Sequence, residues 1–333
     1  MAPAGTHHTI VALESFFVPV PDLELPEPHT YELTEYQRTK PDQVVERIRD
    51  ADIIIISVLP IKAEVLRPEV TPRLKMIAVV ASGVDCVDLE ACKARGIVVA
   101  NTPHCNATSV AEHAIALYFA TRRSIPLSNT LTRQGEWPKR GSLMKTLDGP
   151  DGKPPRTCRD EVVGIIGYGA VGKRIESIAK SLGMKTMISG RKDALAPDGR
   201  TNFGTLLRES SVVILCLPRT SETVDLIKYS ELTTMQPYAV LINVSRGGIV
   251  NENALVAALK NKKIAGAAAD VFSQEPASPD NNPLLGPDTA DLNLVTTPHV
   301  AWCAEDTNDN YNQALKENLH GWLSTGKPRH HVI

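Results

Sequence analysis

Short apolar segments of strand length alternate with longer helical segments over most of this 333-residue chain. Apolar runs such as Ile53–Leu59 are typical of strands that helices bury on both faces of a parallel sheet. The alternation therefore predicts an α/β fold with two doubly wound parallel sheets. We expect strands near residues 9–13, 52–58, 76–81, 97–100, 162–166, 185–189, 212–217, 239–243, 264–270 and 293–297. We expect helices over 41–49, 88–95, 108–122 and 304–322, and irregular surface segments over the proline-rich residues 18–30 and over 135–160.

Composition excludes several classes of protein. Lys and Arg (36) nearly balance Asp and Glu (38), so the net charge of −2 gives no basic surface for nucleic acid. No apolar run approaches the ~18–20 residues of a membrane helix, so no membrane partner is expected. The N-terminal residues 1–8 lack the pattern of a secretory signal, and we expect a cytoplasmic protein. The six cysteines show no CxxC pair or zinc-type spacing, so we expect free thiols and no metal site.

A glycine motif lies between an apolar run and an amphipathic one in the segment 162–179. Its residues are Gly167, Tyr168, Gly169, Ala170, Val171 and Gly172. Gly167 permits a tight turn, Gly169 lets the backbone approach a pyrophosphate, and Gly172 lets helix and strand pack closely. The N-terminus of the following helix would offer its free N–H groups to the phosphates. The motif in this context predicts a Rossmann-like dinucleotide-binding domain.

The residues after the next strand bear on the choice between NAD and NADP. An acid about 20 residues beyond the motif would bind the ribose 2′-hydroxyl of NAD. Ser189 lies at that place, and Arg191 and Lys192 follow it. A hydroxyl and two cations suit a 2′-phosphate, which a carboxylate would repel; we expect the nearest acid, Asp193, to cap the next turn. We therefore predict a preference for NADPH, with NADH possible, the alternative being that Arg191 and Lys192 are a solvated surface pair.

Three short stretches at expected strand ends contain further polar residues. They are 241–248 with Arg246, 269–276 with Glu275, and 295–299 with His299. Together with the glycine motif and the stretches 80–85, 101–103 and 106–113, they make the chain resemble the D-isomer-specific 2-hydroxyacid dehydrogenases. The resemblance covers nearly the whole chain and is greatest to glyoxylate and hydroxypyruvate reductases of the NADP type.

The same three residues suit the reduction of a 2-keto acid. Arg246 offers a planar guanidinium that can hold the carboxylate and polarise the carbonyl. His299 is a natural proton donor, since an unperturbed imidazole has a pKa of about 6.5. Glu275 can hydrogen-bond the other ring nitrogen and favour the protonated ring. The resemblance implies these catalytic roles for the same three residues.

The resemblance also implies a wider set of contacts. For the nicotinamide end of the cofactor it implies Leu217, Pro218, Thr223, Val244, Ser245 and Asp270. For the substrate it implies the backbone N–H groups at Ser82 and Gly83, and Trp302 facing the pocket, with packing between the domains as the alternative for Trp302.

The domain organisation follows from the same resemblance. Residues 1–105 and 303–333 are expected to form a flavodoxin-like substrate domain, and residues 106–302 the dinucleotide-binding domain. Substrate would lie in a cleft between them, from which domain closure expels water. The helix over 108–122 and the loop after it resemble the arm through which the family dimerises, so we expect a homodimer.

Two other functions remain open from the sequence. The alternative among enzymes is a dehydrogenase of bulkier 2-keto acids, aromatic or branched, on which Trp302 would either stack or, by narrowing the pocket, work against binding. A dinucleotide-sensing scaffold similar to the corepressor relatives of this fold is the alternative outside enzymes. The basic turn at 189–192 argues against the scaffold.

Overall fold

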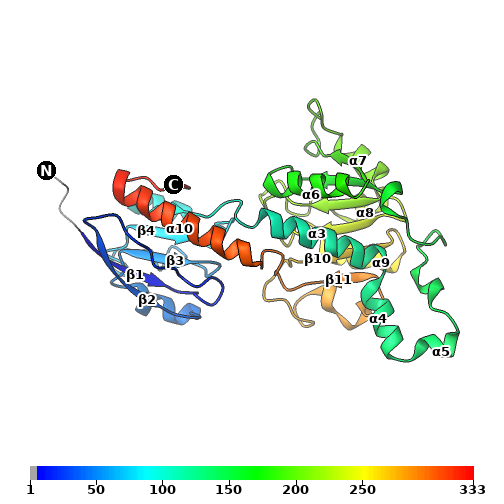
Figure 1. Cartoon of the computed structure of the whole chain (residues 1–333), viewed down its shortest axis with the longest axis horizontal. Coiled ribbons are helices and arrows are strands. Elements are labelled where there is room, and N and C mark those ends of the chain that lie inside the picture. The colour runs from blue at the N-terminus through cyan, green and yellow to red at the C-terminus, as the bar shows by residue number, and fades with distance from the viewer. Residues whose placement is uncertain (1–5) are drawn as a thin grey trace. The chain divides into compact units, whose positions relative to one another are not determined.

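The strands form two sheets, and within each sheet neighbouring strands pair in parallel. The structure is a computed structural model and describes residues 6–333. The first five residues of the segment 1–8, for which no secretory signal is predicted, lie outside the described residues. The chain divides into two units, each built around one sheet (Figure 1). The first contains the chain up to Asn106 together with Cys303–Ile333, and the second contains Ala107–Trp302. The predicted class, two α/β domains with parallel sheets, is confirmed.

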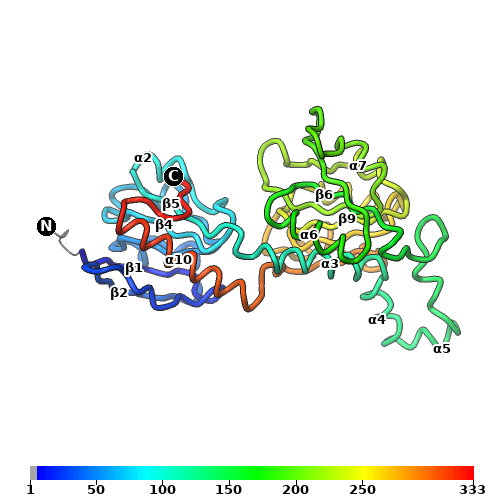
Figure 2. The backbone as a smooth tube through the Cα atoms, turned by 45° about the horizontal axis from the view of Figure 1, so that its top comes forward, coloured from blue at the N-terminus to red at the C-terminus, as the bar shows by residue number. Residues whose placement is uncertain are grey.

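The first unit has a five-stranded sheet in the order β2-β1-β3-β4-β5. Its strands are β1 (His7–Ala12), β2 (Thr30–Glu35), β3 (Ile53–Ile56), β4 (Met76–Val79) and β5 (Val98–Ala100). Its helices are η1 (Pro41–Gln43), α1 (Val44–Ile48), α2 (Leu89–Arg95) and α10 (Glu305–Thr325). Every side chain of β3 and β4 is buried, as expected for central strands. After α10 the chain returns to β5, where Val99 N donates to Ile333 O at 3.1 Å (Figure 2).

Strand β2 is missing from the strands that the sequence predicts. Its sequence, TYELTE, is mostly polar, and none of its side chains is buried. The strand lies at the edge of the sheet and pairs with β1 alone. An edge strand of this kind needs few apolar residues, because only part of its surface faces the core, so hydrophobicity alone does not reveal it.

The second unit has a six-stranded sheet in the order β11-β10-β9-β8-β6-β7. Its strands are β6 (Val162–Ile166), β7 (Lys185–Ile188), β8 (Val212–Leu215), β9 (Val240–Asn243), β10 (Gly266–Ala269) and β11 (Leu294–Thr296). A parallel bridge joins Ser189 to Thr201 just beyond β7. The chain moves outward from β6 to β7 and then crosses back to β8 on the other side of β6. The switch point of this topology, where ligands of open α/β sheets bind, therefore lies between β6 and β8.

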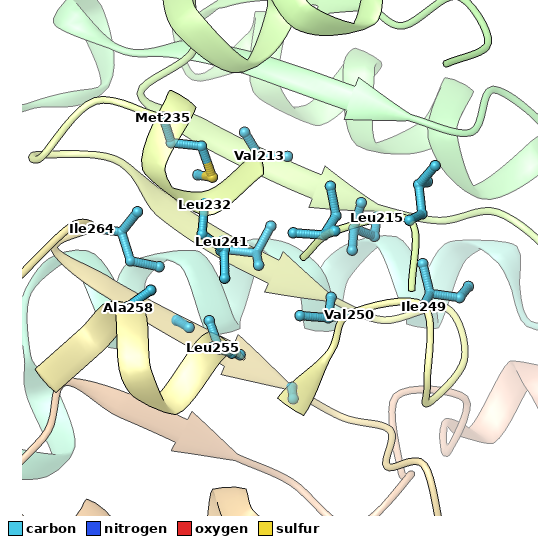
Figure 3. Packing of buried hydrophobic residues seen from close by; sticks show 14 of the residues in the cluster. Val213, Leu215, Leu232, Met235, Leu241, Ile249, Val250, Leu255, Ala258 and Ile264 are labelled. Atoms are coloured by element: carbon cyan, nitrogen blue, oxygen red, sulfur yellow. The ribbon is translucent and has the colours of Figure 1, made fainter. Parts of the chain in front are cut away.

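Helices cover both faces of this sheet. Helices α3 (Ala107–Arg122) and α6 (Ala170–Ser181) bury one face. Helices α7 (Phe203–Glu209), α8 (Tyr229–Thr234) and α9 (Glu252–Lys260) bury the other. Figure 3 shows this second core, in which Leu215 and Leu241 of the sheet lie near Leu232 of α8 and Leu255 of α9. The two cores fix the strand ends that the predicted site residues follow.

The region between α3 and β6 contains more helix than the sequence predicts. The stretch 135–160, expected to be irregular, contains α5 (Glu136–Arg140), η2 (Met144–Leu147) and η3 (Cys158–Asp160). Helix α4 (Ile125–Arg133) precedes that stretch. The prediction of one long loop over 135–160 is therefore wrong in part. These helices are single turns whose side chains are not buried, so they leave no periodic apolar pattern to detect. Within residues 6–333, no helix combines the length and apolarity that a membrane crossing requires.

Candidate active site

Three neighbouring strands of the second unit each end close to one of the predicted catalytic residues. Arg246 follows β9, Glu275 follows β10 and His299 follows β11. Because the strands are parallel and adjacent, their carboxyl ends lie along one edge of the sheet. That edge is where ligands bind in open α/β sheets.

The turn that carries Arg246 is fixed by the last residue of β9. Asn243 Oδ1 accepts hydrogen bonds from Ser245 N at 3.1 Å and from Ser245 Oγ at 2.7 Å. Asn243 Nδ2 donates to Arg246 O at 3.1 Å, and the Arg246 guanidinium donates to Ser245 O at 2.8 Å. Val244 and Ser245 are buried beside it. These polar contacts within the protein hold the turn without any contribution from a ligand.

Glu275 and His299 form a hydrogen-bonded pair. Glu275 Oε2 lies 2.7 Å from His299 Nδ1, and Glu275 Oε1 accepts from Phe272 N at 2.9 Å. Burial opposes ionisation of Glu275, but the hydrogen bond and charge of His299, the Phe272 N–H and the charge of Arg246 outweigh it, and the pKa of Glu275 is lowered. An ionised carboxylate only accepts hydrogen bonds, so Nδ1 of His299 carries the proton that is shared with Glu275. Nε2 is then the nitrogen left for other chemistry.

Asp270 holds the segment on which His299 lies. The Asp270 carboxylate, 1% exposed, accepts from Thr297 Oγ1 at 2.6 Å, Val300 N at 3.0 Å and Ala301 N at 2.9 Å. Its carbonyl accepts from His299 N at 2.8 Å. His299 has a φ of 54°, an unfavourable value for a residue with a side chain. Asp270 thus stabilises this strained backbone, and its contact to a nicotinamide carboxamide stays a prediction.

The glycine motif has the shape of a pyrophosphate site. Gly167 has a φ of 98°, and a Cβ on Gly172 would lie 2.3 Å from Gly167 O, so both positions require glycine. A Cβ on Gly169, in contrast, would meet no atom within 4 Å. Gly169 is also the N-cap of α6, whose first turn has no side-chain cap. Open space over uncapped helix N–H groups fits a dinucleotide's phosphates.

The other predicted cofactor residues follow β7 and β8, on either side of β6. Ser189 Oγ donates to Gly190 O at 2.7 Å, and Arg191 is exposed. Lys192 Nζ lies 2.9 Å from Glu231 Oε1 and also donates to Leu226 O, so its charge is paired within the protein. After β8, Leu217 packs on the core, and Thr223 Oγ1 donates to Pro218 O at 2.9 Å.

Arg200 is a cation at this site that the sequence analysis missed. Thr201 N donates to Ile188 O and Gly190 N donates to Thr201 O, so the excursion 190–200 closes on the end of β7. The closure places the Arg200 guanidinium carbon 4.5 Å from the centroid of the Tyr168 ring, inside the glycine motif. No fixed spacing from the motif points to Arg200, because the length of the excursion is not set by any strand or helix.

The predicted substrate residues lie in both units. In the first, Ser82 and Gly83 follow β4, and the Ser82 carbonyl accepts from Asn101 Nδ2 at 2.8 Å. In the second, Trp302 Nε1 donates to His299 O at 3.0 Å. All six cysteines are free thiols, and no three His, Cys, Asp or Glu side chains in the described part of the chain are grouped to hold a metal ion.

Comparison with known proteins places the chain in a family. Residues 115–301 match the NAD binding domain of D-isomer specific 2-hydroxyacid dehydrogenases. The chain is 39% identical over 307 residues to a glycerate dehydrogenase of Methylorubrum extorquens (92% of each chain). It is 33% identical over 302 residues to a glyoxylate reductase of Pyrococcus furiosus (89% of this chain, 86% of that one).

A solved structure extends the comparison to three dimensions. An NADPH-dependent glyoxylate/hydroxypyruvate reductase of Sinorhizobium meliloti, in complex with NADP and malonate, has 29% identity and a TM-score of 0.76. The match covers 98% of this chain and 97% of that one. The chain is therefore an oxidoreductase that uses a nicotinamide dinucleotide and acts on a CH–OH group. The protein is a member of the D-isomer-specific 2-hydroxyacid dehydrogenase family.

Proposed function

We propose that this enzyme reduces small 2-keto acids to D-2-hydroxy acids and prefers NADPH, with glyoxylate and hydroxypyruvate as the leading substrates. The observation that supports this most is the hydrogen-bonded pair of Glu275 and His299, on strand ends adjacent to that of Arg246. The names of its relatives, glycerate dehydrogenase and glyoxylate reductase, agree with this substrate class.

The three residues divide the work of the reduction. Arg246 binds the substrate carboxylate and polarises the 2-keto oxygen with its guanidinium. A dinucleotide held by the glycine motif would supply the hydride for the keto carbon. His299 donates the Nε2 proton to the oxygen as negative charge develops there. Glu275 keeps the ring oriented through Nδ1 and stabilises its protonated form.

The preference for NADPH rests on the surroundings of β7. Ser189 provides a hydroxyl where NAD-binding relatives of this fold have an acid, and Arg191 and Arg200 flank it with positive charge. Lys192 joins them only when it leaves Glu231. The solved reductase that binds NADP supports this assignment.

The domain roles follow from the placement of the residues. We assign dinucleotide binding to residues 106–302, which contain the glycine motif, and substrate binding to residues 1–105 with 303–333, which contain Ser82 and Gly83. Homodimer formation and a cytoplasmic location stay predictions from the sequence.

The test is a kinetic panel with purified protein. NADPH and NADH oxidation are measured against glyoxylate, hydroxypyruvate, pyruvate, 2-ketoisocaproate and phenylpyruvate, with Arg246→Ala beside the wild type. We expect NADPH-dependent turnover of glyoxylate and hydroxypyruvate by the wild type and its loss in Arg246→Ala. Faster turnover of the bulky acids would replace the substrate assignment, and absence of turnover with either bound cofactor would overturn the enzymatic function.

A further inference from the structure

Glu252 is a buried carboxylate that the proposed chemistry does not use. It lies in the first turn of α9, six residues after Arg246, and is 8% exposed. Helix α9 does not need this side chain as a cap, because Asn251 Oδ1 already accepts from Ala254 N at 2.9 Å. Burial of a carboxylate is costly, so the donors around it must compensate for lost water.

Among the residues that the structure describes, the hydrogen bonds that Glu252 accepts come from the segment that carries Glu275. Ser273 N donates to Oε1 at 2.6 Å, while Ser273 Oγ and Asn282 Nδ2 donate to Oε2, the latter at 2.9 Å. Asn282 is itself buried, and its Oδ1 accepts from Leu284 N at 3.0 Å. The carboxylate thereby holds both ends of the segment 273–282.

A backbone contact also connects the turn that carries Arg246 with the segment that carries Glu275. A Cβ on Gly247 would lie 1.7 Å from Phe272 O and 2.4 Å from Ser273 N, so the backbone after Arg246 packs directly on the backbone before Glu275. Phe272 N is the group that donates to Glu275 Oε1. The close packing on Gly247, together with the hydrogen bond from Phe272 N, therefore transmits any shift of the Ser273 backbone to Glu275 and so to His299.

We propose that Glu252 is a positioning residue for the reaction, which fixes the 273–282 backbone relative to the Arg246 turn so that Glu275 meets His299. The inference rests on the roles proposed above for Glu275 and His299. Without Glu252, Ser273 N and Asn282 Nδ2 lose their acceptor and the segment shifts.

The test compares Glu252→Gln, Glu252→Ala and Ser273→Ala with Glu275→Gln. Gln keeps the shape but cannot accept from all three donors, because one of its terminal atoms is an NH₂ group. We expect kcat to fall about 10- to 100-fold in the Glu252 variants, the loss expected for misplacement of about 1 Å. The KM for the dinucleotide should stay within about twofold. We also expect the pH at which kcat/KM declines to move to lower pH, as in Glu275→Gln.

A double variant and a control separate positioning from general stability. If Glu252 acts through Glu275, the variant with both substitutions is hardly slower than Glu275→Gln alone. Lys260 lies at the other end of α9, and Lys260→Ala breaks an exposed ion pair with Asp288 of η5; this variant should keep the wild-type pH profile. If Glu252→Ala does not fold, Glu252→Gln and Ser273→Ala still decide the question.

The outcomes distinguish the inference from the function on which it rests. Wild-type pH profiles in folded Glu252 variants, or rate losses that multiply in the double variant, would overturn the positioning role. A Glu275→Gln enzyme that behaves as wild type would instead overturn the proposed role of Glu275.

Discussion

The Lys192 ammonium lies 2.9 Å from the Glu231 carboxylate of α8. Burial opposes ionisation of Glu231, but the hydrogen bond from Lys192, with further donors, lowers the pKa of this carboxyl. Lys192 is therefore occupied in joining the 190–200 excursion to α8, whereas the Arg200 guanidinium faces Tyr168. Lys192, which the sequence predicts to meet the 2′-phosphate, is thus paired within the protein, and Arg200, which the sequence did not point to, lies against the glycine motif.

This difference predicts which cation selects NADPH. Arg200→Gln should lower kcat/KM for NADPH by about 10- to 100-fold, the value of a charge-assisted hydrogen bond, and leave NADH nearly unchanged. Lys192→Gln should change the NADPH/NADH ratio much less. Steady-state kinetics of the two variants with both cofactors check this, and equal losses in the two would contradict it.

A second prediction concerns pH and Glu275. The lowered pKa of Glu275 means that this carboxyl stays ionised down to pH values below its ordinary value of 4.5, so it stabilises a protonated His299 throughout the neutral range. Glu275→Gln removes the negative charge, and the high-pH decline of reductase kcat/KM should therefore begin at lower pH than in wild type. A pH series at saturating NADPH measures the shift; a profile that stays in place would show that the charge does not act on the proton donor.

A third prediction separates the glycines of the motif. Gly169→Ala should leave the melting temperature nearly unchanged, because its Cβ meets no atom within 4 Å, yet it should raise the KM for the dinucleotide strongly. Gly172→Ala should lower the melting temperature, since its Cβ would lie 2.3 Å from Gly167 O. Thermal melts in the absence of ligand test the predicted stabilities, and cofactor titrations test the predicted change in dinucleotide binding. Tight dinucleotide binding by Gly169→Ala would argue against the phosphate site.

A fourth prediction concerns stability at the opposite end of the sheet. Glu161 is fully buried and accepts from Arg122 Nε at 2.6 Å, and Arg122 is buried as well. Glu161→Ala leaves the Arg122 charge without its partner and should cost about 3–5 kcal/mol of unfolding free energy. Glu136→Ala removes the surface pairs with Lys139 and Arg140 and should change the unfolding free energy far less, because water and salt screen exposed pairs. Urea unfolding of the two variants compares them directly.

Local sequence was sufficient where a residue's surroundings are set by its own segment. The buried strands β3, β4 and β8 follow from continuous apolar runs, and the glycine motif follows from the turn that only glycine can make. Arg246, Glu275 and His299 were found because each lies in a short motif after a strand. The polar edge strand β2 and the short helices α4 and α5 escaped, because they bury too little to need an apolar pattern.

The sequence by itself determined the fold class, the family, the dinucleotide motif and the residue types available for reduction. Only the tertiary structure decided that Arg200 reaches Tyr168, that Lys192 pairs with Glu231, and that Asp270 faces the His299 segment. The partners of Glu252 are of the same kind, since Ser273 and Asn282 lie 21 and 30 residues away along the chain. Such contacts depend on how loops close over strand ends, which is settled by packing across the sheet and leaves no periodic signal in the sequence.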